Sequence, residues 1–398
     1  MKKNFLWTVA AALTLMSCAA DDLMNESAQV NESNAITFST YVNKTRAAVI
    51  DTDHIKLHGF GVSAYYTKDA TFAAATTEGF GGTFATFMDN TNVSYDAEKG
   101  AWVYSPVKYW PNNVDDKLSF FAYAPYKSAQ IQFPNEDNRS TLVFAVANDV
   151  KEQVDLIYHK AEGVEDESAN IKASIDLVKP SISSTVNFNF LHALSRIAFD
   201  VKAIVDDTET GSDNLLDGNT RININKVALV PAEGDYEVGV GPFYTAAKLS
   251  ILNGEWSEHV DATQGFEFDG DDFYRAVDAE GVSVVQLTKF NPAQRLLTED
   301  SYLMIIPQDF TEDGYRIYIE YDVISEEEHN NGTGANTTSD NSTISHKIYS
   351  EVMNTNFVAG QAYIFNLRLG MTSVKFDAEV TDWTEETPAD AWVPENIE

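Results

Sequence analysis

The chain has 398 residues, of which 44% are hydrophobic and 12% aromatic, and its formal net charge is −34. This acidic balance argues against binding to nucleic acids and against attraction to anionic lipid headgroups, because both need basic surface. The length is sufficient for a large core and favours two domains, and the many Tyr and Phe residues suit the pleated surfaces of sheets.

The N-terminal segment has the three zones of a secretory signal. Two lysines form the charged end, residues 5–16 are apolar, and the small Ser17 precedes Cys18. The apolar stretch is shorter than the roughly 20 residues that a membrane-spanning helix needs. The sequence therefore predicts a signal peptide over residues 1–17, with Cys18 as the first residue of the mature chain.

Cys18 is the single cysteine of the chain, so the exported protein forms no internal disulfide. Together with Leu15, Met16 and Ser17 before it, this cysteine resembles the lipobox of bacterial lipoproteins. The resemblance implies that Cys18 carries a lipid that anchors the protein in the outer membrane, exposed at the cell surface. The sequence predicts that this lipid is the only link to the membrane.

A polar segment and a first strand follow the predicted anchor. Residues 23–34 are polar and poor in aromatics, which indicates a flexible tether. The strand after it has three apolar residues on one face at a period of two. These are Ile36, Phe38 and Val42. We expect residues 18–46 to form this tether and strand, ahead of the main folded part.

The remainder of the chain repeats short aromatic or β-branched runs separated by Gly, Asn, Asp and Pro, a pattern that predicts strands. We expect strands at residues 58–66, 102–104, 118–123, 140–146, 154–159, 184–190, 221–230, 301–306, 315–323 and 363–369. Because long helical periods are absent from the sequence, the predicted fold class is all-β, built from packed β-sandwiches. A change from charged to apolar residues suggests an N-terminal domain over 47–179 and a C-terminal domain over 180–398.

The sequence lacks the motifs that identify common enzymes and metal sites. A single cysteine excludes Cys-based zinc sites and redox pairs, and no G-x-S-x-G, P-loop or H-E-x-x-H motif is present. His54 and His58 have the spacing of two ligands on a helix, but the local alternation predicts a strand, which would separate them. We therefore expect no enzymatic activity, no metal and no cofactor.

Several motifs occur in a fixed order along the chain. They are Trp102 to Pro111, Leu118 to Tyr126, Val154 to His159, Phe190 to Ile197, Gly360 to Leu367, and Asp382 with Trp383. Together they resemble the fimbrillin family, the subunits of type V pili. The resemblance implies two tandem transthyretin-like β-sandwich domains, a lipoprotein precursor, and polymerisation by donor-strand exchange after an arginine-specific protease trims the N-terminus.

Applied to this sequence, the resemblance places the cleavage between Arg46 and Ala47. Removal of the strand before it would leave an apolar groove open to a donor strand. One candidate donor has apolar residues alternating with polar ones, namely Val374, Phe376, Ala378 and Val380. In the alternative, residues 374–381 form the last strand of their own domain, and residues 382–398 are the donor through Trp383, Trp392 and Val393. The sequence leaves both donors open.

Two hypotheses of function follow. In the first, the protein is a polymerising subunit of a surface fimbria with a role in adhesion, and its partners are other fimbrial subunits. In the second, it is a monomeric surface lipoprotein or tip adhesin that binds a glycan or a host protein through its loops. A shaft subunit needs a removable strand and a donor strand, whereas a binder needs only a stable fold and an exposed site. The resemblance favours the first hypothesis.

The first prediction concerns the anchor. Cys18→Ala should abolish acyl labelling and membrane retention of the precursor, because the chain has no other thiol to acylate. Metabolic labelling with a fatty-acid analogue, followed by membrane fractionation, measures both effects. Labelling that survives the substitution would show that the protein is not a lipoprotein of this type.

Overall fold

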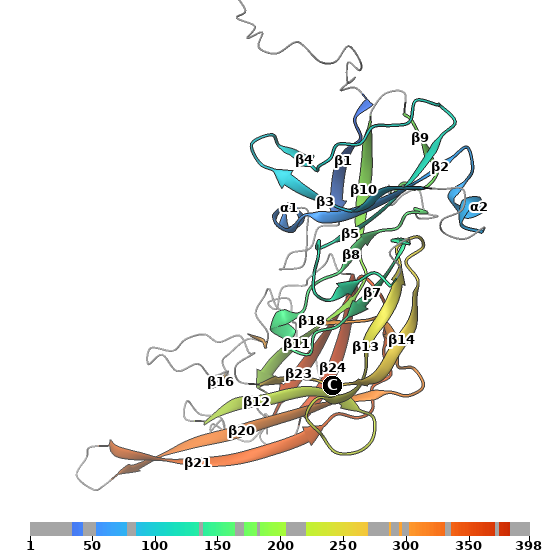
Figure 1. Cartoon of the computed structure of the whole chain (residues 1–398). Coiled ribbons are helices and arrows are strands. Elements are labelled where there is room, and N and C mark those ends of the chain that lie inside the picture. The colour runs from blue at the N-terminus through green and yellow to red at the C-terminus, as the bar shows by residue number, and fades with distance from the viewer. Residues whose placement is uncertain are drawn as a thin grey trace, which may run out of the picture.

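Nearly all of the regular structure in the computed structural model is β-strand (Figure 1). The structure describes residues 34–42, 53–77, 85–134, 138–163, 171–180, 184–203, 220–269, 286–287, 294–296, 302–330, 336–370 and 374–382. The helices within these ranges are α1 (His54–His58), α2 (Phe72–Thr77) and the 3-10 helix η2 (Val150–Glu152). None of the described helices is long and apolar enough to span a membrane. The predicted all-β class is confirmed.

The N-terminal part is built on an eight-stranded sheet with the order β1-β10-β8-β5-β2-β3-β4, in which β9 also pairs with β5. The strands are β1 (Thr37–Val42), β2 (Phe60–Lys68), β3 (Ala85–Asp96), β4 (Ala101–Val103), β5 (Lys117–Ala124), β8 (Ile157–His159), β9 (Leu177–Val178) and β10 (Thr185–His192). β1 and β10 run parallel, and the other neighbours in this sheet are antiparallel. β1 therefore lies at an edge of the sheet.

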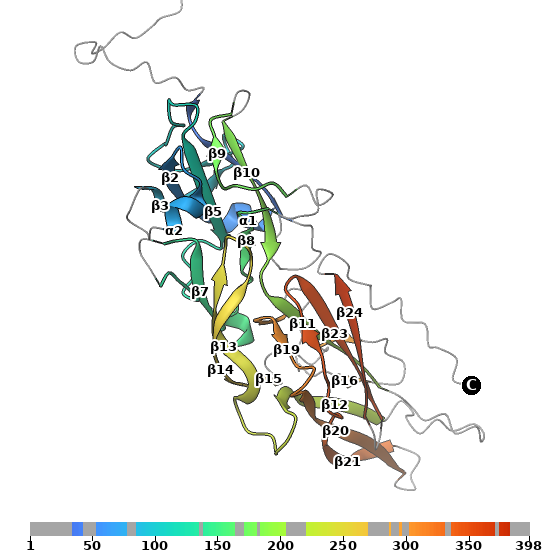
Figure 2. The same ribbon diagram turned by 90° about the vertical axis from the view of Figure 1, so that its right-hand side faces the viewer.

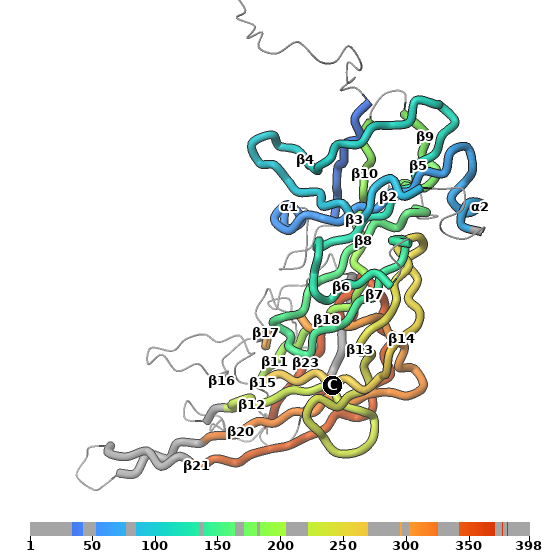
Figure 3. The backbone as a smooth tube through the Cα atoms, viewed as in Figure 1, coloured from blue at the N-terminus to red at the C-terminus, as the bar shows by residue number. Residues whose placement is uncertain are grey.

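A four-stranded sheet joins segments that are far apart in the sequence, in the order β14-β13-β7-β6 (Figure 3). Its strands are β6 (Ile131–Gln132), β7 (Thr141–Ala145), β13 (Val240–Ser250) and β14 (Trp256–Gln264). β7 pairs with β13, while β10 pairs with β1 and β8. Strands from before residue 180 thus pair with strands from after it in two different sheets. The domain boundary between residues 179 and 180 stays a prediction.

The C-terminal part contains two five-stranded sheets and one two-stranded sheet. The first has the order β17-β11-β23-β24 with β18 paired to β11, the second has the order β15-β12-β20-β21 with β16 paired to β12, and β19 pairs with β22. The strands are β11 (Ser195–Ala203), β12 (Thr220–Pro231), β15 (Phe266–Asp269), β16 (Gln286–Leu287), β17 (Gln294–Arg295), β18 (Leu303–Ile305), β19 (Gln308–Asp309), β20 (Tyr315–Asn330), β21 (Asn336–Tyr349), β22 (Asn356–Phe357), β23 (Gln361–Leu369) and β24 (Val374–Asp382). Figure 2 shows β10 running from the N-terminal sheet into β11.

The eight-stranded sheet is buried on both faces at its centre. Successive residues of a strand point to opposite faces, and in β5 Phe120 joins the N-terminal aromatic core while Phe121 joins a larger core. The larger core continues into the C-terminal sheets, where it includes Ile197 of β11 and Phe365 of β23. The two parts of the chain therefore share apolar packing as well as strand pairing.

The passage from β10 to β11 is fixed by hydrogen bonds from several elements. The Ala193 amide donates to the Leu156 carbonyl at 2.8 Å, and the Trp256 indole donates to the Ala193 carbonyl at 3.1 Å. His192 Nδ1 lies 2.8 Å from Asp155 Oδ2, and both side chains are buried. The motif from Phe190 to Ile197 thus connects the N-terminal sheet to the C-terminal sheets.

One local prediction was wrong, because His54 and His58 lie on the short helix α1 and not on a strand. Gly59 ends this helix with a φ of 66°, and a Cβ at this position would lie 2.7 Å from the Val93 carbonyl oxygen. β2 begins only at the next residue. Among the described residues, no group of three or more His, Cys, Asp or Glu side chains could hold a metal ion.

Burial makes His159 of β8 sensitive to pH. Its ring is completely buried, lies edge-on to Phe188 with 5.2 Å between the ring centroids, and accepts a hydrogen bond from the Asn189 amide at 3.2 Å. Desolvation lowers the pKa of His159 to about 4, and the hydrogen bond with the Asn189 backbone opposes this shift only in part.

The second prediction is a loss of stability in acid. Unfolded histidine titrates near its ordinary pKa of 6.5, so the unfolded chain binds more protons than the folded chain as the pH falls from there toward 4. The stabilisation that neutral His159 contributes is fully present above about pH 6.5. It decreases by up to about 3 kcal/mol as the pH falls toward 4. Chemical denaturation from pH 7 to pH 4 measures the free energy of unfolding. His159→Gln should reduce its slope against pH, whereas the control His58→Gln, in an exposed position, should not. Equal slopes in wild type and His159→Gln would contradict the assignment.

Candidate functional site

The candidate site is the seat of β1 at the edge of the eight-stranded sheet. The strand pairs in parallel with β10 from Thr37 to Val42. Just before the strand, the Ile36 amide donates to the Lys108 carbonyl at 2.8 Å, and the Trp110 amide donates to the Asn34 carbonyl at 3.0 Å. The backbone of residues 34–36 thus bonds to residues 108–110, whereas β1 itself pairs with β10.

The inner face of β1 fills an aromatic core. Ile36, Phe38 and Val42 are 1%, 5% and 0% exposed, so the three apolar residues share one buried face. The ring of Phe38 stacks on Phe188 with 5.5 Å between centroids and lies 5.2 Å from Tyr104. Its edge contacts the rings of Phe60 and Phe120. Phe38 is therefore central to the packing of this core.

The outer face of β1 is polar and lies beside polar residues of β10. The hydroxyl of Thr37 is 2.7 Å from that of Thr185, and the hydroxyl of Ser39 donates to Asn187. Tyr41 is 49% exposed. A shallow depression at this face is lined by Ser39, Thr40, Tyr41, Lys172, Asn187 and Asn189. The strand thus separates an apolar core from a polar surface.

Removal of β1 would have two physical consequences. The edge of β10 would lose its hydrogen-bonding partner, and the rings of Phe60, Phe120 and Phe188 would be opened to water. An uncovered strand edge beside an apolar groove binds another extended strand by β-augmentation. This part of the aromatic core is therefore covered by a single edge strand.

The predicted donor region forms β24, the last strand in the order β17-β11-β23-β24. It runs antiparallel to β23, with Phe376 opposite Leu367 and Val380 opposite Tyr363. Phe376 packs against the C-terminal core, whereas Val380 is 55% exposed. The structure thus has β24 as a strand of the C-terminal sheet, the arrangement assumed when residues 382–398 are taken as the donor.

Several predicted site residues lie outside the described residues. They are Cys18, Arg46, Ala47 and Trp383. Lipidation, proteolytic cleavage and the identity of the donor segment therefore stay predictions. The structure buries Ile36, Phe38 and Val42 together on one face of β1. It places β24 at the edge of a different sheet.

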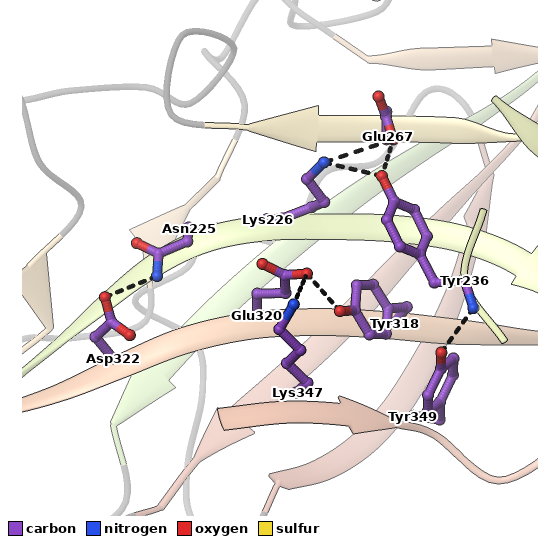
Figure 4. A network of polar contacts seen from close by, with 9 residues as sticks. All are labelled: Asn225, Lys226, Tyr236, Glu267, Tyr318, Glu320, Asp322, Lys347 and Tyr349. Carbon is purple, nitrogen blue, oxygen red and sulfur yellow. Dashed lines mark hydrogen bonds and ion pairs between the residues drawn. The ribbon is translucent and has the colours of Figure 1, made fainter. Parts of the chain in front are cut away.

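A second polar cluster, which the sequence analysis missed, covers the outer face of β12, β15, β20 and β21 (Figure 4). The ring of Tyr236 stacks on Tyr318 with 4.6 Å between the ring centroids. The backbone amide of Tyr236 donates to the Tyr349 hydroxyl at 2.7 Å. The Lys226 amine donates to the Tyr236 hydroxyl at 2.8 Å, and this hydroxyl donates to the Glu267 carboxylate. These contacts hold the connection between β12 and β13 against the sheet. No local sequence signal shows that Tyr236 folds back in this way.

Comparisons with known proteins agree with this architecture. A sequence model described as fimbrillin-like matches residues 45–383. The fimbrium subunit Fim1C of Phocaeicola vulgatus is 25% identical over 415 residues, which cover 98% of this chain and 99% of that relative. The crystal structure of a fimbrial protein from Bacteroides vulgatus covers 88% of this chain and 100% of its own, with a TM-score of 0.63 and 22% identity. The structural likeness concerns the fold.

The third prediction tests the burial of β1 in the uncleaved chain. Phe38→Ala should lower the free energy of unfolding by about 3–5 kcal/mol, because it leaves a cavity among the aromatic rings. Tyr41→Ala, on the outer face of the same strand, is the control and should change stability by no more than about 0.5 kcal/mol. Denaturant titration of both variants measures the difference. Similar costs for the two substitutions would mean that Phe38 does not occupy this core.

Proposed function

Because the chain belongs to the fimbrillin-like family, we propose that this fimbrial subunit polymerises by exchanging β1 for a strand of another copy after proteolysis. The observation that carries the proposal is the seat of β1, an edge strand that places Ile36, Phe38 and Val42 in an aromatic core. An edge strand can be replaced without disturbing the order of the other strands in its sheet.

Cleavage between Arg46 and Ala47 would cut the chain four residues after Val42. It would not by itself expel the strand, because each large apolar side chain contributes about 1.5–3 kcal/mol when it is fully buried. Cleavage does turn an intramolecular contact into a dissociable one. A competing strand that restores the same burial can then take its place, so the groove is filled again and not left open to water.

The same cut would release the subunit from its lipid. Cys18 precedes Arg46 in the sequence, so a chain that begins at Ala47 carries neither the anchor nor β1. The precursor would be a lipoprotein at the outer membrane, and the processed chain would enter a surface fimbria. Anchoring and polymerisation therefore exclude each other in one molecule, and an arginine-specific protease changes the subunit from the first state to the second.

The fourth prediction concerns Arg46. Treatment of the purified precursor with an arginine-specific protease should give a chain that begins at Ala47 and forms filaments, as followed by mass spectrometry and electron microscopy. Arg46→Ala should stay uncut at this bond and form no filaments. Arg46→Lys keeps the positive charge but removes the arginine, so it should behave as Arg46→Ala does if cleavage is what matters.

Two results would count against the proposal. Filaments of uncut Arg46→Ala would show that strand removal is not needed. A wild-type chain that is cut at Arg46, stays monomeric and binds a glycan or a host protein would favour a monomeric surface adhesin.

A further inference from the structure

A polar depression on the outer face of β1 and β10 has no part in the proposed exchange of strands. Its volume is about 190 Å³, which is below the range of about 300–1,000 Å³ that is typical of pockets for drug-sized ligands. The depression therefore has room for one small ring. Its lining residues come from β1, from β10 and from the segment before β9, namely Ser39, Thr40 and Tyr41, Asn187 and Asn189, and Lys172.

The lining residues present hydrogen-bonding groups beside one aromatic ring. Ser39 and Tyr41 are on the polar face of β1, and they pair with Asn187 and Asn189 in the register of the two strands. Tyr41 is 49% exposed, so its ring offers apolar surface and its hydroxyl a polar tip. A sugar ring has the complementary character, with C–H groups on its faces and hydroxyl groups around its edge. The depression is thus suited to a sugar ring.

The lining differs in charge from the chain as a whole. Lys172 is the one charged residue among the described residues that line the depression, although the chain has 61 Asp and Glu and only 27 Lys and Arg. The lysine ammonium donates hydrogen bonds and accepts none. Charges beyond about 8 Å are largely screened at physiological ionic strength, so the local lysine counts for more than the distant carboxylates. This lining favours a ligand with a negative group.

The amide of Asn187 is oriented by a contact between the two strands. The Ser39 hydroxyl donates to Asn187 Oδ1, and the two N–H donors of this amide have no other partner among the described residues. The backbone amide of Asn189 donates to His159 Nδ1 at 3.2 Å, which fixes the next lining position from the neighbouring strand β8. Paired strands hold a site more precisely than loops do. The donors are therefore in place before a ligand binds.

We propose that this depression binds one sugar ring that carries a carboxylate, a sugar of the hexuronate class. The ring lies on Tyr41, its hydroxyl groups bond to the asparagine side chains, and its carboxylate accepts a charge-assisted hydrogen bond from Lys172. A ligand of about a dozen non-hydrogen atoms in such a site has a dissociation constant on the order of 1 mM. Several such units on one surface would raise the overall affinity of a cell that carries many copies.

The site depends on β1, which contributes half of the lining residues. A chain that begins at Ala47 lacks Ser39, Thr40 and Tyr41. A ligand bound across β1 and β10 stabilises their pairing by mass action, because it binds only when both strands are in place. The inference concerns the uncut chain, so it does not depend on the proposed polymerisation.

Ligand-observed NMR titration of the purified uncut chain tests the proposal. The probes are methyl glucuronide and methyl galacturonide, each compared with the methyl glycoside that has a hydroxymethyl group in place of the carboxylate, and acetate. We expect at least one uronide to bind about fivefold more tightly than its neutral counterpart and than acetate, which is the range of an exposed ionic contact. Lys172→Gln should remove this preference. Tyr41→Ala should weaken the uronide and the neutral sugar alike, because the ring does not contact the carboxylate.

The control is Lys347→Gln, which removes an exposed lysine of β21 in the C-terminal sheet and should leave every dissociation constant unchanged. Absence of saturable uronide binding would overturn the proposal. Acetate binding as tight as that of the uronides would show that the depression recognises charge alone and no sugar. Uronide binding that is unchanged in both Lys172→Gln and Tyr41→Ala would place the ligand elsewhere on the molecule.

Discussion

Burial of an aromatic side chain on an edge strand is the contact on which the proposed assembly of this subunit depends. Phe38 packs among the rings of Phe60, Tyr104, Phe120 and Phe188, yet its strand has β10 as its neighbour in the sheet. Edge strands with unpaired backbone groups are open to pairing with other chains. In the proposed exchange, a cut after β1 would allow this segment to leave, and the packing that it fills in the precursor would become the groove for a partner strand.

The second face of the sheet would hold the subunit together if β1 were removed, as the proposed exchange requires. Phe121 and Tyr123 of β5 point away from β1, into the larger core that continues through β11 and β23. β7 adds strand pairing to β13, and the Ala193 segment is bonded to residues of both parts. Loss of β1 opens one core, while the other continues to hold the central strands against the C-terminal sheets. Exchange at one edge is therefore compatible with a stable remainder.

The sequence predicted much of the strand content because most strands have alternating or continuous buried apolar residues. The buried face of β1 was clear from Ile36, Phe38 and Val42 alone. β14 escaped prediction since nearly all of its residues are exposed, which leaves no period of two. α1 was mistaken for a strand because five residues are too few to show a helical period. Pairing across residue 180 and the fold-back of Tyr236 depend on contacts between distant segments, which no local pattern contains.

Of the candidate site, the sequence indicated the strand and two possible donors but could not choose between them. In the structure β24 pairs with β23 in the C-terminal sheet, and the identity of the donor stays a prediction. Cys18 was predicted from the leader and its resemblance to a lipobox, and Arg46 from the resemblance to fimbrillins; the roles of both are part of the proposal. The exchange model therefore joins a packed groove that the structure shows to a cleavage and a donor that are inferred.

Hydrogen-exchange mass spectrometry on purified filaments tests the central claim most directly. The account predicts that the peptide preceding Ala47 is absent from the filaments, while the amides of β10 are as strongly protected as in the precursor, because a strand of another copy has replaced β1. Filaments that retain the peptide with β1, or that have lost it and leave the β10 amides unprotected, would contradict the account.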